Sequence, residues 1–232
     1  MTGIRILDLN IWNYNEPWPA RRERIVDLIQ STAPDMVALQ EIRYHEDRTE
    51  PGHQAAQILA RLTGYACIWQ PAHYWPPETT QSTGGKRWEG LAILSRYPIV
   101  DQGLYRLSRD ADDPRDSFQR LVLGAQARTT SGLFWLFNTH FPLSGRARNR
   151  AIVEAFGFVT QTAQGQPFAF TGDLNAGPEE RPVRFLTGQA EIDGCSGDLI
   201  DAWAACHPDG PGYTFSAWEP RQRIDYVFVP HT

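Results

Sequence analysis

Chemically capable polar side chains stand at or near the ends of several apolar runs in this chain. The set consists of Asn10, Gln40-Glu41, Asn138-Thr139-His140, Asp173-Leu174-Asn175 and Asp225. Carboxylates such as Glu41 and Asp173 are hard oxygen ligands that suit Mg²⁺, and the imidazole of His140 can donate to a phosphoryl oxygen. With amides to orient water and phosphate, such a set supplies the metal, the positioned nucleophile and the charge stabilisation needed to hydrolyse a phosphate ester. That chemistry is the prediction.

Each of these signals, taken alone, also fits an ordinary structural role. Asn10 could be a hydrogen-bonded core amide, Glu41 a helix cap or a solvent-facing turn residue, and His140 a structural histidine. Asp173 and Asn175, two positions apart, either project to the same side of an extended segment or form a simple turn. Their recurrence at strand ends favours a site, because a rigid sheet holds such residues in a fixed geometry. The sequence has no Walker loop, cysteine-nucleophile motif or His-Glu-x-x-His motif that would indicate another mechanism.

Asp225 is unusual because its carboxylate interrupts a strongly apolar strand pattern from Arg223 to Val229. Burying this charge without a partner would cost several kcal/mol. We therefore expect another group to pair with it.

Apolar runs of strand length alternate with helical patterns, which favours a layered α/β domain. The expected strands cover residues 4–11, 35–40, 65–70, 90–94, 99–107, 121–127, 133–137, 167–171 and 223–229. Helices are expected from Pro19 onward, over about 55–64 and over about 146–162, where apolar residues recur at helical spacing. A Gly- and Pro-containing stretch before residue 223 should cross the surface. The segment Pro71–Trp88 is expected to be a long loop whose aromatic rings and cations line a substrate cleft or cover a sheet edge.

The composition is that of a folded protein of moderate size. The 232 residues are 41% hydrophobic and 21% charged, which suffices for one large domain or two small ones. We find no internal repeat and no dividing linker, so we expect a single domain over residues 1–232. The net charge of −5 disfavours nonspecific binding of long nucleic acid, which needs an excess of Lys and Arg, and favours a small or already exposed phosphate ester.

Signals for secretion and membrane insertion are missing from the sequence. No stretch approaches the roughly 20 apolar residues that cross a bilayer, and the N-terminus lacks a signal-peptide core. Cys67, Cys195 and Cys206 are widely spaced and odd in number, so we expect buried thiols and neither disulfides nor a metal site. A reducing cytoplasm fits this composition best.

The ordered set of segments resembles the endonuclease/exonuclease/phosphatase superfamily, whose members share a DNase I-like fold. The matching segments are Leu9-Asn10-Ile11-Trp12, Leu39-Gln40-Glu41, Gly90 to Pro98, Asn138-Thr139-His140, Gly172-Asp173-Leu174-Asn175 and Arg223-Ile224-Asp225-Tyr226. Each motif is short and unspecific by itself, but their order along most of the chain is specific. The resemblance implies an α/β fold, a four-layer sandwich of two packed mixed β-sheets flanked by helices. It also implies Mg²⁺ as the cofactor, with Mn²⁺ as the alternative.

The resemblance assigns a role to each member of the set. By this resemblance, Glu41 is the principal Mg²⁺ ligand, and Asn10 lies near the metal. Asp173 would orient or deprotonate the attacking water, Asn175 would hold the scissile phosphate and His140 would stabilise charge on its oxygens. The implied substrate-binding residues are Asn10, Arg120, Asn138 and Arg150. Both arginines fit a surface or structural role equally well.

The resemblance also implies a Ser-Asp-His element some tens of residues after the strand that holds Asp225, and its histidine would pair with Asp225 as a catalytic acid/base. The chain ends Val229-Pro230-His231-Thr232, before that element. Continued strand would carry His231 roughly 20 Å from Asp225. We therefore expect a C-terminally truncated domain that lacks its last strand. A second chain that completes the site and a degenerate family member are the alternatives.

Two functions stay open at this stage. The first is a Mg²⁺-dependent phosphodiesterase, nuclease or phosphatase that uses a metal-bound, Asp-oriented water. The second is a catalytically inactive member that binds a phosphorylated ligand or a protein partner. The expected phosphate-ester substrate is a small molecule, a lipid headgroup or a nucleic acid, because similar folds serve all of them. Neither a membrane span nor an obligate protein partner is evident in the sequence.

Overall fold

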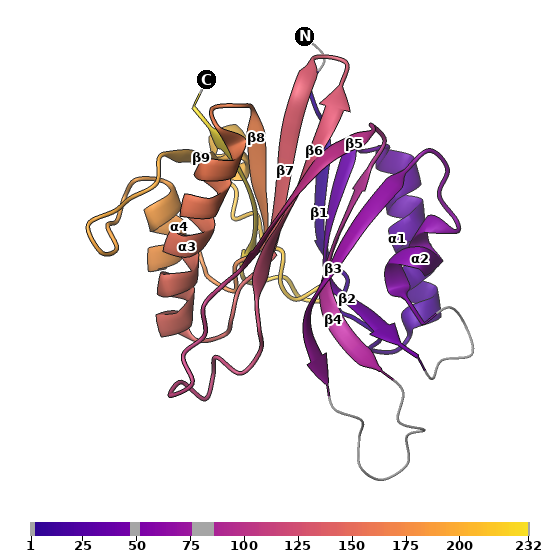
Figure 1. Ribbon diagram of the computed structural model, residues 1–232, viewed down its shortest axis with the longest axis horizontal. Coiled ribbons are helices and arrows are strands. Elements are labelled where there is room, and N and C mark those ends of the chain that lie inside the picture. Colours follow the sequence, from indigo (N-terminus) through magenta and orange to yellow (C-terminus); the bar gives the residue numbers. More distant parts are fainter. Residues whose placement is uncertain (1–2, 47–51, 76–85, 232) are drawn as a thin grey trace.

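The computed structural model describes residues 3–46, 52–75 and 86–231, and two β-sheets pack face to face at its centre with helices outside them (Figure 1). The 4-stranded sheet has the order β1-β2-β4-β3, and the 6-stranded sheet has the order β5-β6-β7-β8-β10-β9. Each sheet combines parallel and antiparallel pairs. The expected four-layer α/β sandwich is confirmed.

The smaller sheet contains β1 (Ile6–Asn10), β2 (Met36–His45), β4 (Arg87–Ser95) and β3 (Ala66–Trp75). Helices α1 (Trp18–Thr32) and α2 (Gln54–Leu59) cover its outer face. Pro19 lies in the first turn of α1, where a missing backbone N–H costs nothing. Ile25 and Ile29 are buried as expected, whereas Leu28 is 37% exposed, so the expected apolar stripe is narrower than its spacing indicated.

The larger sheet contains β5 (Ile99–Arg106), β6 (Leu121–Thr129), β7 (Gly132–His140), β8 (Phe168–Asp173), β10 (Asp225–Pro230) and β9 (Leu199–Asp201). Helices α3 (Gly145–Ala163) and α4 (Arg181–Leu186) lie outside it, and α5 (Ala202–Cys206) follows β9. The hydroxyl of Ser144 caps α3 by accepting a hydrogen bond from the Ala147 N–H at 3.2 Å. The expected helix over 146–162 is thereby confirmed.

Small and medium-sized apolar side chains fill the layer between the two sheets. They include Met36, Ala38, Leu91 and Ile93 from the smaller sheet and Leu121, Leu123, Ala125, Leu136 and Ala169 from the larger one. Asn138 lies fully buried at this interface. Its Nδ2 donates to the backbone oxygens of Leu39 and Ala92 at 2.9 and 3.0 Å, and its Oδ1 accepts from Gln40 at 2.7 Å. One amide therefore ties β7 to two strands of the facing sheet.

The expectation of a loop over residues 71–88 is wrong at both ends. Strand β3 continues to Trp75, which pairs with Arg87 at the start of β4. Pro71 lies at a register shift between Pro71 and His73, so the irregularity accommodates the proline that interrupts the strand pattern. Trp88 is buried and stacks on another ring, and residues 76–85 lie outside the described ranges.

Two smaller expectations also differ from the structure. Strand β9 and helices α4 and α5 form within the Gly- and Pro-containing stretch, which was assigned only to the surface. All three cysteines are free thiols, but only Cys67 is even half-buried, and the exposed Cys195 and Cys206 contradict the expectation of buried thiols.

Across residues 3–46, 52–75 and 86–231, no helix has both the length and the apolar character needed to cross a bilayer.

Candidate active site

Strands from both sheets bring polar side chains to one edge of the sandwich. Strands β1 and β2 run parallel, and their pairing ends with Asn10 beside Gln40. Strands β7 and β8 also run parallel, and their pairing ends with His140 beside Asp173. Strand β1 packs against β8 and β10 of the larger sheet, so these two pairs meet. Gly172 permits the approach because its φ is +142° and a Cβ there would lie 2.1 Å from the Thr139 carbonyl oxygen.

The amide of Asn10 joins the two carboxylates on which the predicted chemistry depends. Its Nδ2 donates to Glu41 Oε1 at 3.1 Å and to Asp173 Oδ2 at 3.0 Å. The other oxygen of Glu41 accepts from Asn13 Nδ2 at 2.6 Å. Glu41 and Asp173 come from different sheets, yet a single amide group reaches both. The two carboxylates therefore belong to one polar cluster.

Strained backbone concentrates around this cluster. Glu41 has φ +56° and Asn175 has φ +49°, both in the left-handed region that side chains other than Gly rarely adopt. The pairing of β2 with β4 shifts register between Leu39 and Ile42, as in a β-bulge, and Glu41 lies within this irregularity. The Glu41 side chain therefore does not follow the regular alternation of side chains along the strand. Such conformations cost about 1–3 kcal/mol each and often occur at functional sites. The strain therefore marks this edge as a candidate site.

Asn175 is fixed by two hydrogen bonds. Its backbone N–H donates to Asp173 Oδ1 at 2.8 Å, and its Nδ2 donates to the carbonyl oxygen of Phe141 at 2.9 Å. The Asp-x-Asn segment is thus a tight turn as well as a part of the cluster. Of the two interpretations that the sequence left open, the turn is the one that forms, since the strand ends at Asp173.

His140 presents a defined nitrogen to the cluster. Arg120 Nη1 lies 2.9 Å from His140 Nδ1. Because a guanidinium only donates, Nδ1 must accept and the proton of the neutral ring lies on Nε2. Burial lowers the pKa of His140 well below its usual value, and the charges of Arg120 and His73 lower it further. The neutral ring therefore directs an Nε2–H donor toward Asp173, whose Oδ2 is 3.7 Å away.

Three aspartates crowd the other side of the cluster. Burial raises the pKa of Asp173 to about 7, and the neighbouring Asp225 carboxylate adds to the shift. Burial also raises the pKa of Asp8 well above its usual value, again with a contribution from Asp225. Burial also raises the pKa of Asp225, and the hydrogen bond of the Thr214 hydroxyl offsets part of that rise. The Thr214 hydroxyl is thus the described group that pairs with Asp225, as the sequence required of some group, while Asp225 Oδ1 has no hydrogen-bond partner among the described residues.

This donor set fits a divalent cation with an open coordination sphere. Asp8 Oδ2 and Asp225 Oδ1 are buried and have no hydrogen-bond partner in the described part of the chain. Within that same part, no three or more His, Cys, Asp or Glu side chains are arranged to enclose a metal. Mg²⁺ usually binds one or two carboxylates and keeps several of its waters. Glu41, with Asn10 beside it, suits that mode of binding.

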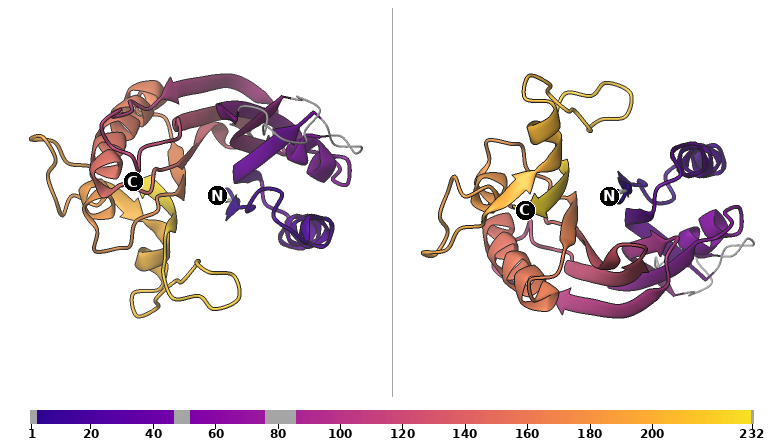
Figure 2. Two further views of the ribbon diagram at one scale, coloured as in Figure 1. Left: turned by 90° about the horizontal axis from the view of Figure 1, so that it is seen from below. Right: turned by 90° about the horizontal axis from the view of Figure 1, so that it is seen from above.

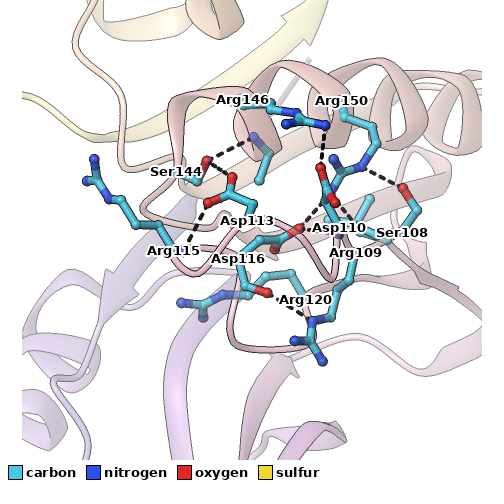
Figure 3. A network of polar contacts seen from close by, with 12 residues as sticks. Ser108, Arg109, Asp110, Asp113, Arg115, Asp116, Arg120, Ser144, Arg146 and Arg150 are labelled. Atoms are coloured by element: carbon cyan, nitrogen blue, oxygen red, sulfur yellow. Dashed lines mark hydrogen bonds and ion pairs between the residues drawn. The ribbon is translucent and has the colours of Figure 1, made fainter.

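Two of the predicted substrate-binding residues lie apart from the cluster. Asn138 is buried between the sheets, where its amide is fully used. Arg150 reaches from α3 to the loop between β5 and β6, where its Nη2 binds the buried carboxylate of Asp116 at 2.6 Å (Figure 3). Arg120 is the last residue of that same loop, and it contacts His140 directly. Arg150 can therefore support Arg120 only through the loop.

Several residues at this edge escaped the sequence interpretation. Asp8 could have been found by the criterion applied to Asp225, since it too is an acid inside an apolar strand. Asn13, which binds Glu41, follows no recognisable pattern. His73 and Glu89 line a cavity of about 10 Å³ beside His140 and Arg120, which is room for about one water. His73 is brought there by the part of β3 that was expected to be a loop, and Glu89 by β4, one residue beyond that expected loop.

Comparison with known proteins agrees with this architecture. The model of the Endonuclease/Exonuclease/phosphatase family matches residues 9–232. The human Nocturnin catalytic domain with bound sulfate is similar with a TM-score of 0.72 and 22% identity, covering 97% of this chain and 81% of that one. An endonuclease/exonuclease/phosphatase from Bacteroides vulgatus has a TM-score of 0.73 and 21% identity, covering 99% and 88%. A mannosyl-6-phosphatase from Bacteroides thetaiotaomicron has a TM-score of 0.69 and 19% identity, covering 98% and 85%. No curated protein sequence matches.

Proposed function

Because the chain belongs to the endonuclease/exonuclease/phosphatase family, we propose that it is a phosphoesterase that hydrolyses phosphate esters with Mg²⁺ or Mn²⁺ bound at Glu41. The observation that carries this proposal is the Asn10 amide, which joins Glu41 and Asp173 beside the donor nitrogen of His140. A bound divalent cation would neutralise the crowded carboxylates and polarise a phosphoryl oxygen.

The chain's own groups supply the remaining parts of the reaction. The carboxylate of Asp173 accepts the proton of the attacking water, and Asn10 fixes the orientation of that carboxylate. His140 donates from Nε2 to a non-bridging phosphoryl oxygen, where negative charge increases in the transition state. Arg120 keeps this nitrogen protonated by occupying Nδ1. Asn175, whose backbone N–H donates to Asp173, would contact the scissile phosphate.

The net charge and one structural neighbour favour a compact phosphate ester as the substrate. The net charge of −5 gives little attraction for long nucleic acid, so a compact or exposed phosphate ester is favoured. A mannosyl-6-phosphatase of similar fold makes a sugar phosphate monoester a reasonable first substrate to test.

The test compares turnover of bis(p-nitrophenyl) phosphate and p-nitrophenyl phosphate in Mg²⁺, Mn²⁺ and EDTA. Asp173→Asn and Glu41→Gln should each lower metal-dependent turnover by about 10²-fold or more, as loss of a positioned acid/base or a metal ligand does. Glu179→Gln is the matched control, since Glu179 is an exposed acid six residues from Asp173. Unchanged turnover in both site variants would contradict the proposal.

Calorimetry separates this function from the binding module that the sequence left open. Titration with MgCl₂ and then with inorganic phosphate should show binding that weakens in Glu41→Gln. Binding without any turnover of the ester substrates would instead favour a catalytically inactive member that recognises a phosphorylated ligand.

A further inference from the structure

Two exposed tryptophans from opposite halves of the molecule meet next to the carboxylate cluster. Trp12 follows β1 of the smaller sheet, and Trp218 lies on the arm formed by residues 207–224, which leads into β10 of the larger sheet. Their ring centroids are 5.5 Å apart at an interplanar angle of 62°. Even in this contact, Trp12 is 43% and Trp218 is 75% exposed. Figure 2 shows the arm, in yellow, curving toward the half that carries α1.

Trp12 is held in its exposed position by strained backbone. Trp12 has φ +56° and the next residue, Asn13, has φ +42°. Arg21 fixes this turn by donating to four backbone oxygens, those of Ile11, Trp12, Asn13 and Asn15, at 2.6 to 3.3 Å. Its guanidinium also lies 5.3 Å from the Trp12 ring centroid. A costly conformation that holds a large apolar ring in solvent indicates a binding role.

Both tryptophans are tied to residues of the candidate site. The backbone N–H of Trp12 donates to Asn10 Oδ1 at 2.9 Å, on the same amide that joins Glu41 and Asp173. The arm is anchored by Thr214, whose hydroxyl oxygen accepts from the N–H groups of Ile224 and Asp225 at 3.2 and 3.3 Å. The Trp12 backbone therefore lies directly beside the carboxylate cluster at which the phosphate would bind.

The surroundings of the two rings favour a flat apolar group over a sugar or a lipid surface. Sugar recognition needs polar partners for hydroxyl groups, yet Arg21 is occupied by carbonyls and Glu219 is paired with Arg221. Binding to an anionic membrane surface is favoured by basic residues, whereas this chain has a net charge of −5. An indole face beside the edge of a second indole instead suits stacking of a planar ring, which every nucleobase offers.

We propose that Trp12 and Trp218 form a stacking site for a planar aromatic group, such as a nucleobase, carried by the phosphate ester. This inference rests on the proposed function, because it names the substrate class of that same site. The phosphate would bind at the Asn10–Glu41–Asp173 cluster, and the ring would insert against the two indoles. A mononucleotide carries both groups, a phosphate and a planar base.

The test measures equilibrium binding with Ca²⁺ in place of Mg²⁺, by calorimetry and by quenching of tryptophan fluorescence. The probes are AMP, UMP, p-nitrophenyl phosphate, ribose 5-phosphate and mannose 6-phosphate. AMP should bind 5- to 100-fold more tightly than ribose 5-phosphate, which corresponds to about 1–3 kcal/mol for one stacked base. Trp218→Ala should abolish that difference without changing the Kd of ribose 5-phosphate, and Trp218→Phe should retain most of it.

Trp69→Ala is the matched control, because Trp69 is 47% exposed and stacks on Trp88 in the smaller sheet. It should leave the preference for AMP unchanged. Equal Kd values for AMP and ribose 5-phosphate would overturn the stacking site while leaving the phosphoesterase intact. A Trp218-dependent gain for mannose 6-phosphate, or a blue shift of tryptophan emission with phosphatidylcholine vesicles that Trp218→Ala removes, would assign the pair to sugar or lipid instead. Failure of every phosphate to bind or be hydrolysed would overturn the proposed function as well.

Discussion

Asp173 and Asp225 stand directly opposite each other on the antiparallel strands β8 and β10. Like charges in this arrangement repel, and their burial removes the water that would screen them. Burial raises the pKa of both carboxyls, and the facing Asp225 charge raises the pKa of Asp173 further. Three carboxyl groups, counting Asp8, thus share a region whose described donors are amides, hydroxyls and the neutral imidazole of His140. The fold tolerates a local excess of negative charge that a cation would relieve.

Replacing Asp225 with Asn should stabilise the cation-free protein. The change removes one charge of the opposed pair while keeping its size, and we expect a gain of about 1 kcal/mol, or roughly 2–4 °C in Tm for a chain of this size. Thermal unfolding in EDTA measures the gain. The further rise in Tm on adding MgCl₂ should be smaller in the variant, since less repulsion is left to relieve. Asp193→Asn, at an exposed turn, is the control, and a lower Tm for Asp225→Asn in EDTA would contradict the repulsion.

Arg120 should act on the reaction through His140. Arg120→Gln removes a cationic donor from Nδ1, so the ring can place its proton on either nitrogen, and turnover should fall by about 10- to 100-fold. Nitrogen NMR of the imidazole should show Nε2–H as the single tautomer in the wild type and a mixture in the variant. Arg128→Gln replaces an exposed arginine on β6, the strand that follows Arg120, and should change neither turnover nor the tautomer. A fall in turnover without any change in the tautomer would mean that Arg120 acts in another way.

Asn138 should matter for stability more than for substrate binding. Asn138→Leu removes the donor to two buried backbone carbonyls and the acceptor of one Gln40 hydrogen bond between the sheets, and we expect a loss of about 3 kcal/mol in the free energy of unfolding. Urea denaturation measures that loss. Gln161→Leu, on the exposed side of α3, should stay within about 0.5 kcal/mol of the wild type. A variant with wild-type stability and a raised KM would restore Asn138 to the substrate site.

His53 should make the protein less stable in acid. Burial among the rings of Tyr44, Trp69 and Trp88 lowers the pKa of His53 to about 4, below the ordinary value of 6.5 in the unfolded chain. Between pH 6.5 and pH 4 the unfolded chain binds this proton more readily than the folded chain does. The stabilisation that comes from the neutral imidazole is therefore complete above pH 6.5 and is lost as the pH falls toward 4.

His53→Phe keeps an aromatic ring and removes this titration. In this variant the free energy of unfolding should fall less on acidification. After allowance for the partial exposure of the ring, we expect the difference to be on the order of 1 kcal/mol. Urea unfolding at a series of pH values from 4 to 7 measures the slope in both proteins. Identical slopes would show that His53 is not protonated differently in the folded and unfolded chains.

Much of the fold could be predicted from the sequence because its signals are local. The apolar run before Asn138 and the helical spacing of Ile152 and Val159 each specify one element, and both elements form as expected. The loop assigned to Pro71–Trp88 failed for the same reason, since a local pattern cannot show that Pro71 will be accommodated by a register shift against a partner strand.

The sequence by itself determined which acids, amides and histidine stand at strand ends and in what order, because strand length and side-chain alternation are properties of short segments. Only the tertiary structure decided which of them meet. Asn10 reaches Glu41 and Asp173, Asn138 is buried between the sheets, and Trp218 meets Trp12 from a segment that carried no signal. The physical reason is that contacts between strands far apart in the chain depend on how two sheets pack, and that packing is decided by the buried layer between them.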